Sequence, residues 1–462
     1  MNSSPQPGQP HARLLTPLAA VAVIVGIVVG AGIFKTPSMV AGITGDLGWL
    51  LALWVAGALL SLAGALCYAE LCTAFPSSGG EYHFLHRAFG RHLSFLYAWA
   101  KAFVINPGAI ALLGYVFGDY MTQVWSLGEH SAAVWAAFII VLLTLTNLFG
   151  LQASARLQSL LLAAALLGLA VVVMVGLWGP PAQGPLSEMP WFNTTPPLGL
   201  LGLAMVFVLL TFGGWGEAAY LSSEVKGQAR TMVWVLVGSL LLISALYLLV
   251  NLSLVHALGL QGLAQSKAAA ADAMRLSFGP WAERLLGIIV ALAALTSINA
   301  TMIIGGRTMQ SLGADWQGLR GLSQWREDIG VPTRAIWLQG FISLGLVGFG
   351  AFQHDGFEAM VEFTAPVFWF FLTLVGLALV VLRWREPSVV RPFRVPLYPV
   401  VPLLFCASSA YLTHSSVQYA ASQNAVSVSV GVMLLGVLVL VLLRIQQPGS
   451  PETEAAGPPS GA

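Results

Sequence analysis

The sequence predicts an all-α integral membrane protein with twelve transmembrane helices. Of its 462 residues, 57% are hydrophobic and only 8% are charged, whereas soluble domains carry about 25% charged residues. Apolar stretches of roughly 20 residues, the length that crosses a bilayer as a helix, recur along the chain. A soluble fold could not bury this much apolar surface. The chain therefore has the lipid bilayer as its expected surroundings.

The expected spans follow one another with short connections and leave no room for a soluble domain. They cover residues 16–41, 47–74, 93–124, 132–149, 155–178, 199–223, 231–256, 281–309, 333–352, 359–383, 397–414 and 425–444. Residues 1–15 are polar and rich in proline, and we expect them to be a cytoplasmic N-terminal tail. Residues 445–462 have the composition of a disordered tail. The expected membrane domain is therefore 16–444.

Positive charge predicts the orientation. With the N-terminus inside, fifteen Lys and Arg residues lie on the cytoplasmic side, and only Lys267, Arg275 and Arg284 lie outside. Because positively charged loops remain in the cytoplasm, we expect both termini there, with the protein in the cell (inner) membrane. The net charge of +1 provides no broad basic face, so no nucleic acid partner is expected. The three cysteines lie in apolar stretches and suggest no disulfide framework.

Residues 26–38, GIVVGAGIFKTPS, interrupt the first span. Gly26, Gly30 and Gly32 fall within seven residues, and Lys35 and Pro37 follow. Glycine loosens a helix, and proline removes a hydrogen-bond donor. A freed backbone group finds no water in hydrocarbon, so this break must be buried in protein or line a wet cavity.

A second glycine cluster lies in the sixth span, FGGWGEAAYLSSEVK, with Gly213, Gly214 and Gly216 near its middle. Glycine also serves close packing in membrane helices, so either cluster alone favours packing. Spans 1 and 6, however, begin two five-helix blocks, about 16–178 and 199–383. Interrupted helices in corresponding positions of two halves indicate a transporter site near the midplane. An odd number of spans per block makes the blocks opposite in orientation, and helices at about 397–444 are an addition.

The two breaks favour a zwitterionic ligand, an α-amino acid. Unpaired N–H groups at the start of a half-helix suit a carboxylate, and unpaired carbonyls at the end of another suit an ammonium group. The expected contacts are the N–H groups of Ala31, Gly32 and Ile33 for the carboxylate and the carbonyls of Ile27, Val28 and Thr211 for the ammonium group. The rest of the expected substrate site is Gly30, Phe212, Gly213, Gly214 and Trp215.

Four ordered stretches carry a resemblance to a known family: GAGIFKTPS, YAELCTAFPSSGGEYHFL (68–85), FGGWGEAAYLSSEVK and RPFRVPLYPVVPLLF (391–405). They resemble the amino acid–polyamine–organocation superfamily, and within it the L-type amino acid transporter branch. The similarity covers about 16–440. It implies a LeuT-type fold, transport by alternating access, and a substrate between spans 1, 3, 6, 8 and 10.

Three departures from the family pattern change what the resemblance implies. Leu210 holds the common position of an aromatic gate, so Phe212 or Trp215 is expected to take that role. Animal members join a glycoprotein through a cysteine after span 3, and GDYMTQVWSLGEHS has none, so no disulfide-linked heavy-chain subunit is implied. Many members carry a lysine in span 5, where this chain has Ala165.

The eighth span offers a replacement for that missing charge. Ala293, Thr296 and Ser297 share one helix face, and sodium-coupled relatives of the fold use a carbonyl and two hydroxyls at this spacing. The resemblance adds the carbonyls of Gly26 and Val29, which gives a candidate Na⁺ site. The alternative is that both hydroxyls only bond back to their own backbone. No other cofactor is expected.

For each of four polar residues inside spans, the sequence leaves two interpretations of its role open. Glu217 caps the second half of span 6, or serves proton transfer or a cationic substrate. Asn106, which precedes Pro107, either contacts substrate or marks a packing kink. Asn299 bonds between helices or contacts substrate. Lys35 is expected to extend outward along the bilayer, or else to pair with Glu217.

The function that the sequence predicts is secondary active transport of neutral L-amino acids by alternating access. An enzyme is not expected, because the sequence has no phosphate loop and no Cys/His metal spacing. An uncoupled exchanger is one alternative, and a carrier of cationic amino acids or polyamines with Glu217 as counter-ion is another. A third, from a different class, is a nutrient receptor that binds its ligand without moving it.

Overall fold

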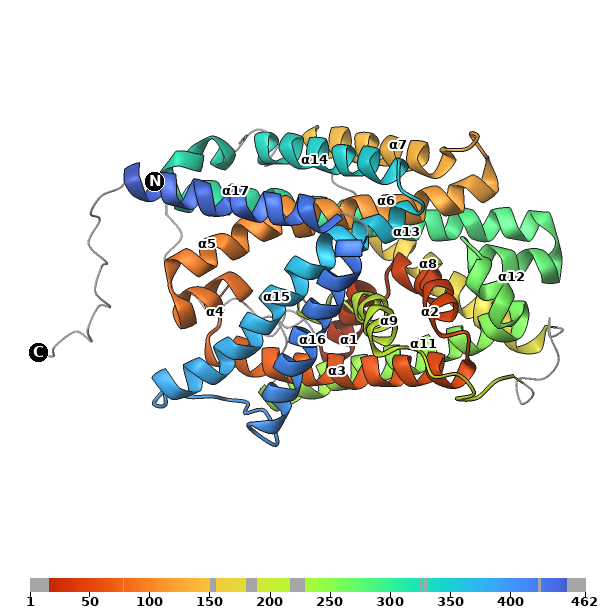
Figure 1. The fold of residues 1–462 in the computed structure, drawn as a ribbon, viewed down its shortest axis with the longest axis horizontal. Helices are drawn as coiled ribbons and strands as arrows, with labels where there is room; N and C mark the ends of the chain where they lie inside the picture. Colours follow the sequence, from red (N-terminus) through yellow and green to blue (C-terminus); the bar gives the residue numbers. More distant parts are fainter. Residues whose placement is uncertain are drawn as a thin grey trace, which may run out of the picture.

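The computed structural model describes residues 16–77, 79–149, 155–179, 189–216, 229–324, 326, 331–422 and 425–446. Within these ranges the regular structure is helical, apart from one backbone pairing of Arg326 with Val331. Most of the long helices run roughly along the longest axis of the molecule (Figure 1). Long, uniformly apolar segments favour helices in lipid, because a helix satisfies its own backbone hydrogen-bonding groups.

Among the described residues, eight helices are long and apolar enough to cross a membrane. They are Leu47–Ala74 (α3), Arg91–Val124 (α5, Arg91–Ala100; η2, Lys101–Ile105; α6, Asn106–Val124), Ser131–Leu148 (α7), Val233–Gln265 (in α11, Ala229–Gln265), Pro280–Asp315 (α13), Thr333–Ala351 (α14), Gly356–Arg385 (α15) and Val400–Ala421 (in α16, Val400–Ser422). All eight lie at positions of expected spans. The largest differences are at the ends of α11 and α16, which continue several residues beyond the expected bounds.

The remaining expected spans are helical over most of their described residues. They are Ala155–Trp178 (α8), Leu198–Thr211 (α9), Ala425–Gln446 (α17) and an interrupted first span made of Pro17–Val28 (α1), Ala31–Phe34 (η1) and Thr36–Thr44 (α2). The short helices Gly80–Phe89 (α4) and Ala269–Phe278 (α12) lie at opposite ends of the molecule (Figure 1). These two helices are used below to name the α4 end and the α12 end.

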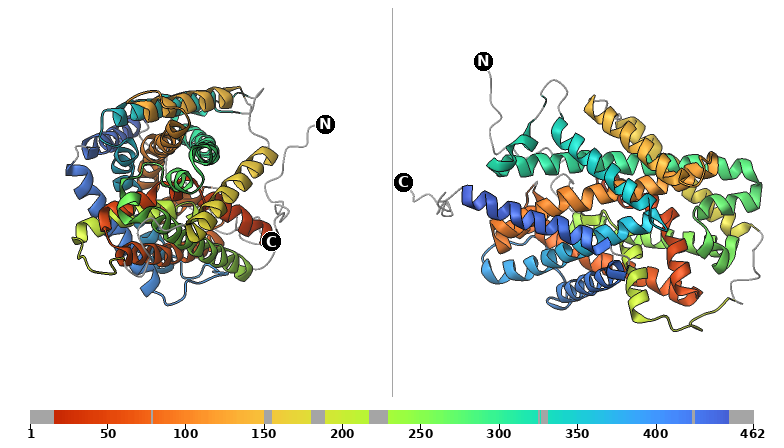
Figure 2. Two further views of the ribbon diagram at one scale, coloured as in Figure 1. Left: turned by 90° about the vertical axis from the view of Figure 1, so that its right-hand side faces the viewer. Right: turned by 45° about the horizontal axis from the view of Figure 1, so that its top comes forward.

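Helices from the two halves of the chain are interleaved. The helix α6 packs against its neighbour α7 and also against α13 and α15 from the second half, and α11 packs against α1, α2 and α3. Two further views show the orange helices of the first half lying among the green and cyan helices of the second (Figure 2). The two interrupted segments are thereby brought together in the interior.

A buried carboxylate fixes the start of α3. The Asp46 side chain accepts hydrogen bonds from the N–H groups of Trp49 (3.1 Å), Phe192 (2.9 Å) and Asn193 (2.9 Å). It therefore caps the helix and also holds the segment that precedes α9. Burial acts to raise the pKa of Asp46, but these N–H bonds outweigh it and lower the pKa.

Candidate functional site

The first interrupted span is confirmed in the described residues. The helix α1 ends at Val28, Gly30 is extended (φ −101°, ψ −168°), and η1 follows before α2 begins at Thr36. As the first residues of a 3-10 segment, Ala31 and Gly32 have N–H groups without an acceptor inside that segment, whereas the i→i+3 pattern directs the Ile33 N–H group to the Gly30 carbonyl. The segment thus presents two of the three donors that the sequence predicted for a carboxylate.

The sixth expected span is also interrupted, at the place that the glycines indicated. The helix α9 ends at Thr211, and the chain turns through Phe212, Gly213 and Gly214, the last with a φ of +97°. That φ lies in a region that side chains with a Cβ rarely adopt. Glu217 and the rest of this span lie outside the described residues, so the role of Glu217 stays a prediction.

The two breaks contact each other directly. The Thr36 and Thr211 hydroxyls are 2.6 Å apart, and a Cβ placed on Gly32 would lie 3.5 Å from the Thr211 Oγ1 atom. The Tyr247 hydroxyl is within 3.1 Å of the Val28 carbonyl and 3.2 Å of the Thr211 carbonyl. Two of the three carbonyls expected to receive an ammonium group therefore converge on one point.

Tyr247 is the residue of this site that sequence reasoning missed. It lies in α11, its side chain is fully buried, and its ring packs against Trp54 and Phe212. A buried tyrosine hydroxyl needs a hydrogen-bond partner, so a tyrosine in the middle of an apolar span indicates a polar contact in the interior. Its partners could not be identified from sequence, because they lie on two distant helices.

The candidate sodium ligands of span 8 lie beside the first break. A Cβ placed on Gly30 would be 3.5 Å from the Ser297 Oγ atom. The Thr296 and Ser297 hydroxyls donate to the Ala293 carbonyl, at 2.7 and 3.3 Å. Both hydroxyls thus make the bond to their own helix that was the alternative to ion binding. Of the other candidate ligands, Gly26 packs against Leu162 of α8.

A cavity of about 200 Å³ lies beside the second break, and its lining residues outside that break come from α3, α4, α5, η2, α6, α9, α13, α15 and α16. The residues that line it include Ser61, Tyr68, Glu81, Tyr97, Lys101, Asn106, Gly213, Gly214, Trp215, Gly216, Thr301, Phe368, Trp369, Phe371, Leu372 and Phe405. The lining is mainly apolar. Among the described residues, the Asn106 Nδ2, Ser61 Oγ and Trp369 Nε1 atoms are buried without a hydrogen-bond partner. An occupant with acceptor oxygens would satisfy them.

The charged groups that line the cavity compensate each other. The Glu81 carboxylate accepts hydrogen bonds from the Tyr97 hydroxyl (2.6 Å), the Tyr68 hydroxyl (3.2 Å) and the Lys101 ammonium group (3.2 Å). Lys101 therefore has a carboxylate partner inside the protein. Among the described residues, every charged side chain that lines the cavity has an oppositely charged partner.

The other predicted residues divide between the cavity and the helix packing. Trp215 lines the cavity, whereas Phe212 is fully buried against Trp54 and Tyr247. The Asn299 amide oxygen accepts a hydrogen bond from Asn147 of α7 at 2.8 Å. This is the contact between helices that was one of its two readings.

The expected outward orientation of Lys35 is wrong. Its side chain is fully buried, and its ammonium group lies 2.7 Å from the Asp119 carboxylate and 3.7 Å from the Asp355 carboxylate. Carboxylates from two other helices provide compensation inside the protein, so the ammonium group does not need to reach water.

Comparisons with known proteins agree with this architecture. The family model described as amino acid permease matches residues 15–443. The chain is similar to mouse b(0,+)-type amino acid transporter 1, at 27% identity over 401 residues that cover 86% of this chain and 80% of the relative. It is also similar to the serine/threonine exchanger SteT of Bacillus subtilis, at 26% identity, covering 86% of this chain and 90% of the relative.

A third relative is the mouse large neutral amino acids transporter small subunit 2, at 26% identity, covering 84% of this chain and 74% of the relative. All three are amino acid transporters by name, as the L-type resemblance implied. The family match extends over nearly the whole chain. The chain therefore belongs to the amino acid permease family of the amino acid–polyamine–organocation superfamily, a family of membrane transporters and not of enzymes.

Proposed function

We propose that this permease is a secondary transporter of neutral L-amino acids that works by alternating access. The observation that carries the proposal is the meeting of the two interrupted helices, where the Val28 and Thr211 carbonyls converge on the Tyr247 hydroxyl. Two carbonyls aimed at one point provide partial negative charge for an ammonium group. The free N–H groups of η1 provide the opposite charge for a carboxylate.

The ammonium group is accommodated without loss of the Tyr247 contact. Each carbonyl oxygen has two lone pairs. The Tyr247 hydroxyl has a single proton, so it donates to only one of the two carbonyls at a time. An ammonium group has three donors, which can reach both carbonyls together. We infer that the substrate nitrogen binds beside the Tyr247 hydroxyl, between the ends of α1 and α9.

The proposed preference for neutral side chains follows from the cavity. Its only charged lining residues among those described, Glu81 and Lys101, pair with each other. A cationic or anionic side chain would have to displace that pair or remain uncompensated. The apolar walls and the three unpartnered polar atoms suit side chains that are apolar or that carry one acceptor oxygen.

The finer architecture is part of the proposal. The two blocks 16–178 and 199–383 are proposed to be inverted repeats of a LeuT-type fold with twelve spans, and 397–444 its two added helices. One helix bundle rocks against the rest around the site at the breaks. Both termini face the cytoplasm, since the positive charges lie on that side. No disulfide-linked heavy-chain subunit is proposed.

Sodium coupling is proposed separately from the amino acid site. Its support is the position of Ser297 against the first break. The Thr296 and Ser297 oxygens keep unused lone pairs, but the Ala293 carbonyl already accepts from both hydroxyls, so these hydroxyls must turn away from it before it can bind Na⁺. The competing mode is exchange of one amino acid for another without a coupling ion, as the name of the Bacillus subtilis relative describes for that protein.

Transport by purified protein in liposomes tests both proposals. Liposomes loaded with unlabelled amino acid should take up labelled neutral amino acid, with saturation and with competition by other neutral amino acids. Binding without uptake would instead support a receptor. Sodium coupling predicts that a sodium gradient raises accumulation and that the double substitution Thr296→Ala and Ser297→Ala removes this effect. Uptake that is equal with and without the gradient contradicts it.

A further inference from the structure

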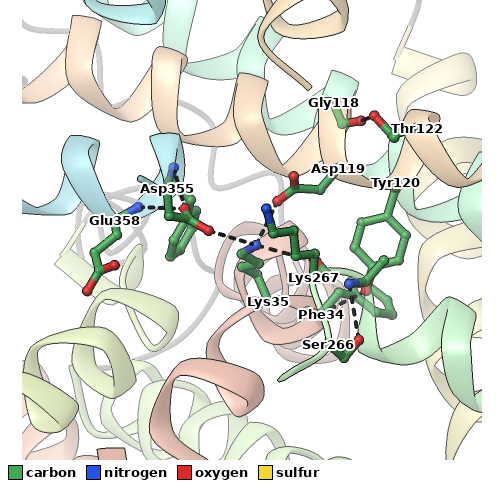
Figure 3. Close-up of polar contacts among 12 residues, drawn as sticks. Phe34, Lys35, Gly118, Asp119, Tyr120, Thr122, Ser266, Lys267, Asp355 and Glu358 are labelled. Carbon is green, nitrogen blue, oxygen red and sulfur yellow. Dashed lines mark hydrogen bonds and ion pairs between the residues drawn. The ribbon is translucent and has the colours of Figure 1, made fainter. Parts of the chain in front are cut away.

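The most deeply buried charge near the breaks belongs to Lys35, which joins η1 to α2. Its ammonium group lies between Asp119 near the end of α6 and Asp355 before α15, and it donates a 3.4 Å hydrogen bond to the Lys267 carbonyl (Figure 3). The Lys35 side chain is 0% exposed, and the two carboxylates are 11% and 15% exposed. We refer to Lys35, Asp119 and Asp355 as the Lys35 cluster.

The Lys35 cluster links the second half of the interrupted span to two long helices. A second contact supports the link, since the Tyr120 hydroxyl donates to the Phe34 carbonyl at 2.8 Å. Asp355 has a further role, because its other oxygen accepts from the Phe357 and Glu358 N–H groups and so caps α15. Its carboxylate is therefore held in place for Lys35.

The Lys35 cluster and the cavity lie at different depths of the same helices. In α6, Asp119 follows the cavity residue Asn106 by 13 residues, and in α15, Phe368 follows Asp355 by 13 residues. At 1.5 Å per residue, each interval is about 20 Å. Lys267 precedes α12, so the cluster lies toward the α12 end. The cavity includes Glu81 of α4 and lies toward the other end.

We propose that the Lys35 cluster closes the α12 end of the transport path, and that Lys35 separates from Asp119 and Asp355 when that end opens. This inference rests on the proposed function, because only alternating access requires one end to close while the other is accessible. Lys35 is thus a positioning residue for the second half of the first span.

The position of Lys35 in the chain couples the closure to the substrate. Lys35 follows Gly32, whose N–H group is the second of the two free ones proposed for the carboxylate, by only three residues. A rotation of η1 that changes the grip on the substrate must also move the Lys35 backbone. When Lys35 separates from Asp119 and Asp355, one ammonium group and two carboxylates lose their partners, and such unpaired charges are unfavourable unless water solvates them. Opening of the α12 end would supply that water. The charges are therefore paired in the closed arrangement and hydrated in the open one.

A thiol reporter beside the cluster tests this inference. Ala268 follows Lys267 and is fully buried, so Ala268→Cys reports whether the α12 end is accessible. The three natural cysteines are replaced in this background by Cys67→Ala, Cys72→Ala and Cys406→Ala. The readout is the labelling rate with a membrane-impermeant maleimide in liposomes. With Lys35→Met, we expect labelling at least about tenfold faster than in the parent, because a population shift of that size needs only part of the interaction of a buried pair.

Two further substitutions keep the test decisive. Asp119→Asn should also accelerate labelling, and Lys35→Arg, which keeps the charge, should stay close to the parent. Lys101→Met removes an ammonium group from the cavity end and should leave labelling at Ala268→Cys unchanged. Equal labelling of the parent, Lys35→Met and Asp119→Asn would overturn the inference, and so would an equal rise with Lys101→Met.

The same liposomes separate the inference from the proposed function. Amino acid exchange by the parent is measured in parallel with the labelling. Exchange with unchanged labelling in the Lys35→Met variant overturns only the role of the cluster. Absence of any amino acid uptake or exchange by the parent overturns the proposed function, and with it the meaning assigned to the closure.

Discussion

Replacing Gly214 with valine is expected to reduce amino acid transport about 100-fold while the protein still folds. Gly214 has a φ of +97° in the second break, where a β-branched residue is strongly disfavoured. The turn after α9 would shift, and with it the Thr211 carbonyl. A misplacement that costs about 3 kcal/mol in the transport step corresponds to the expected factor.

The matched control for Gly214→Val is Gly238→Val. Gly238 lies within helix α11, where a Cβ would meet no atom within 4 Å, so valine there should leave transport within about twofold of the parent. Initial rates of labelled amino acid exchange and size-exclusion profiles are the two measurements. Normal exchange by a folded Gly214→Val variant would mean that this turn does not shape the substrate site.

Replacing Glu70 with alanine is expected to destabilise the fold by about 3–5 kcal/mol. The Glu70 side chain is fully buried at the end of α3 and accepts two bonds from Arg383, at 2.7 and 2.5 Å. It also lies 3.5 Å from Arg391 and accepts a 2.6 Å bond from the Val395 N–H group. Alanine would leave two guanidinium groups without their carboxylate and would free the segment before α16.

An exposed ion pair of similar length provides the comparison for Glu70→Ala. Arg87 and Glu386 lie 2.6 Å apart, but their side chains are 41% and 25% exposed. Glu386→Ala should therefore cost about 1 kcal/mol or less. The thermal unfolding midpoint in detergent should fall much more for Glu70→Ala than for Glu386→Ala. Equal midpoints would contradict the importance assigned to burial of the Glu70 pair.

The helices and both breaks could be predicted because their signals are local. Hydropathy over about 20 residues locates a span, and glycine in a short stretch weakens a helix wherever that helix packs. Thus Gly30 and Gly214 were placed in breaks without knowledge of their neighbours. The backbone contacts at Val28 and Thr211 follow from the same reasoning, since a helix end always frees carbonyl groups.

The side-chain partners could not be predicted, because they depend on how distant helices face each other. The burial of Lys35 needs Asp119, which is 84 residues away, and nothing in the local sequence shows that the two meet. The same holds for Asn299 and its partner Asn147, 152 residues apart. The partners of Tyr247 also depend on the relative positions of two helix ends, those of α1 and α9.

The most direct test of the account is competition by molecules that carry only part of the amino acid backbone. Exchange of a labelled neutral amino acid in liposomes is measured with excess unlabelled amino acid, with its decarboxylated amine, and with the acid that lacks the amino group. If the free N–H groups of η1 and the carbonyls of Val28 and Thr211 bind the two charged groups, only the intact zwitterion should compete well. Competition by the amine or the acid that equals that of the amino acid would contradict the account.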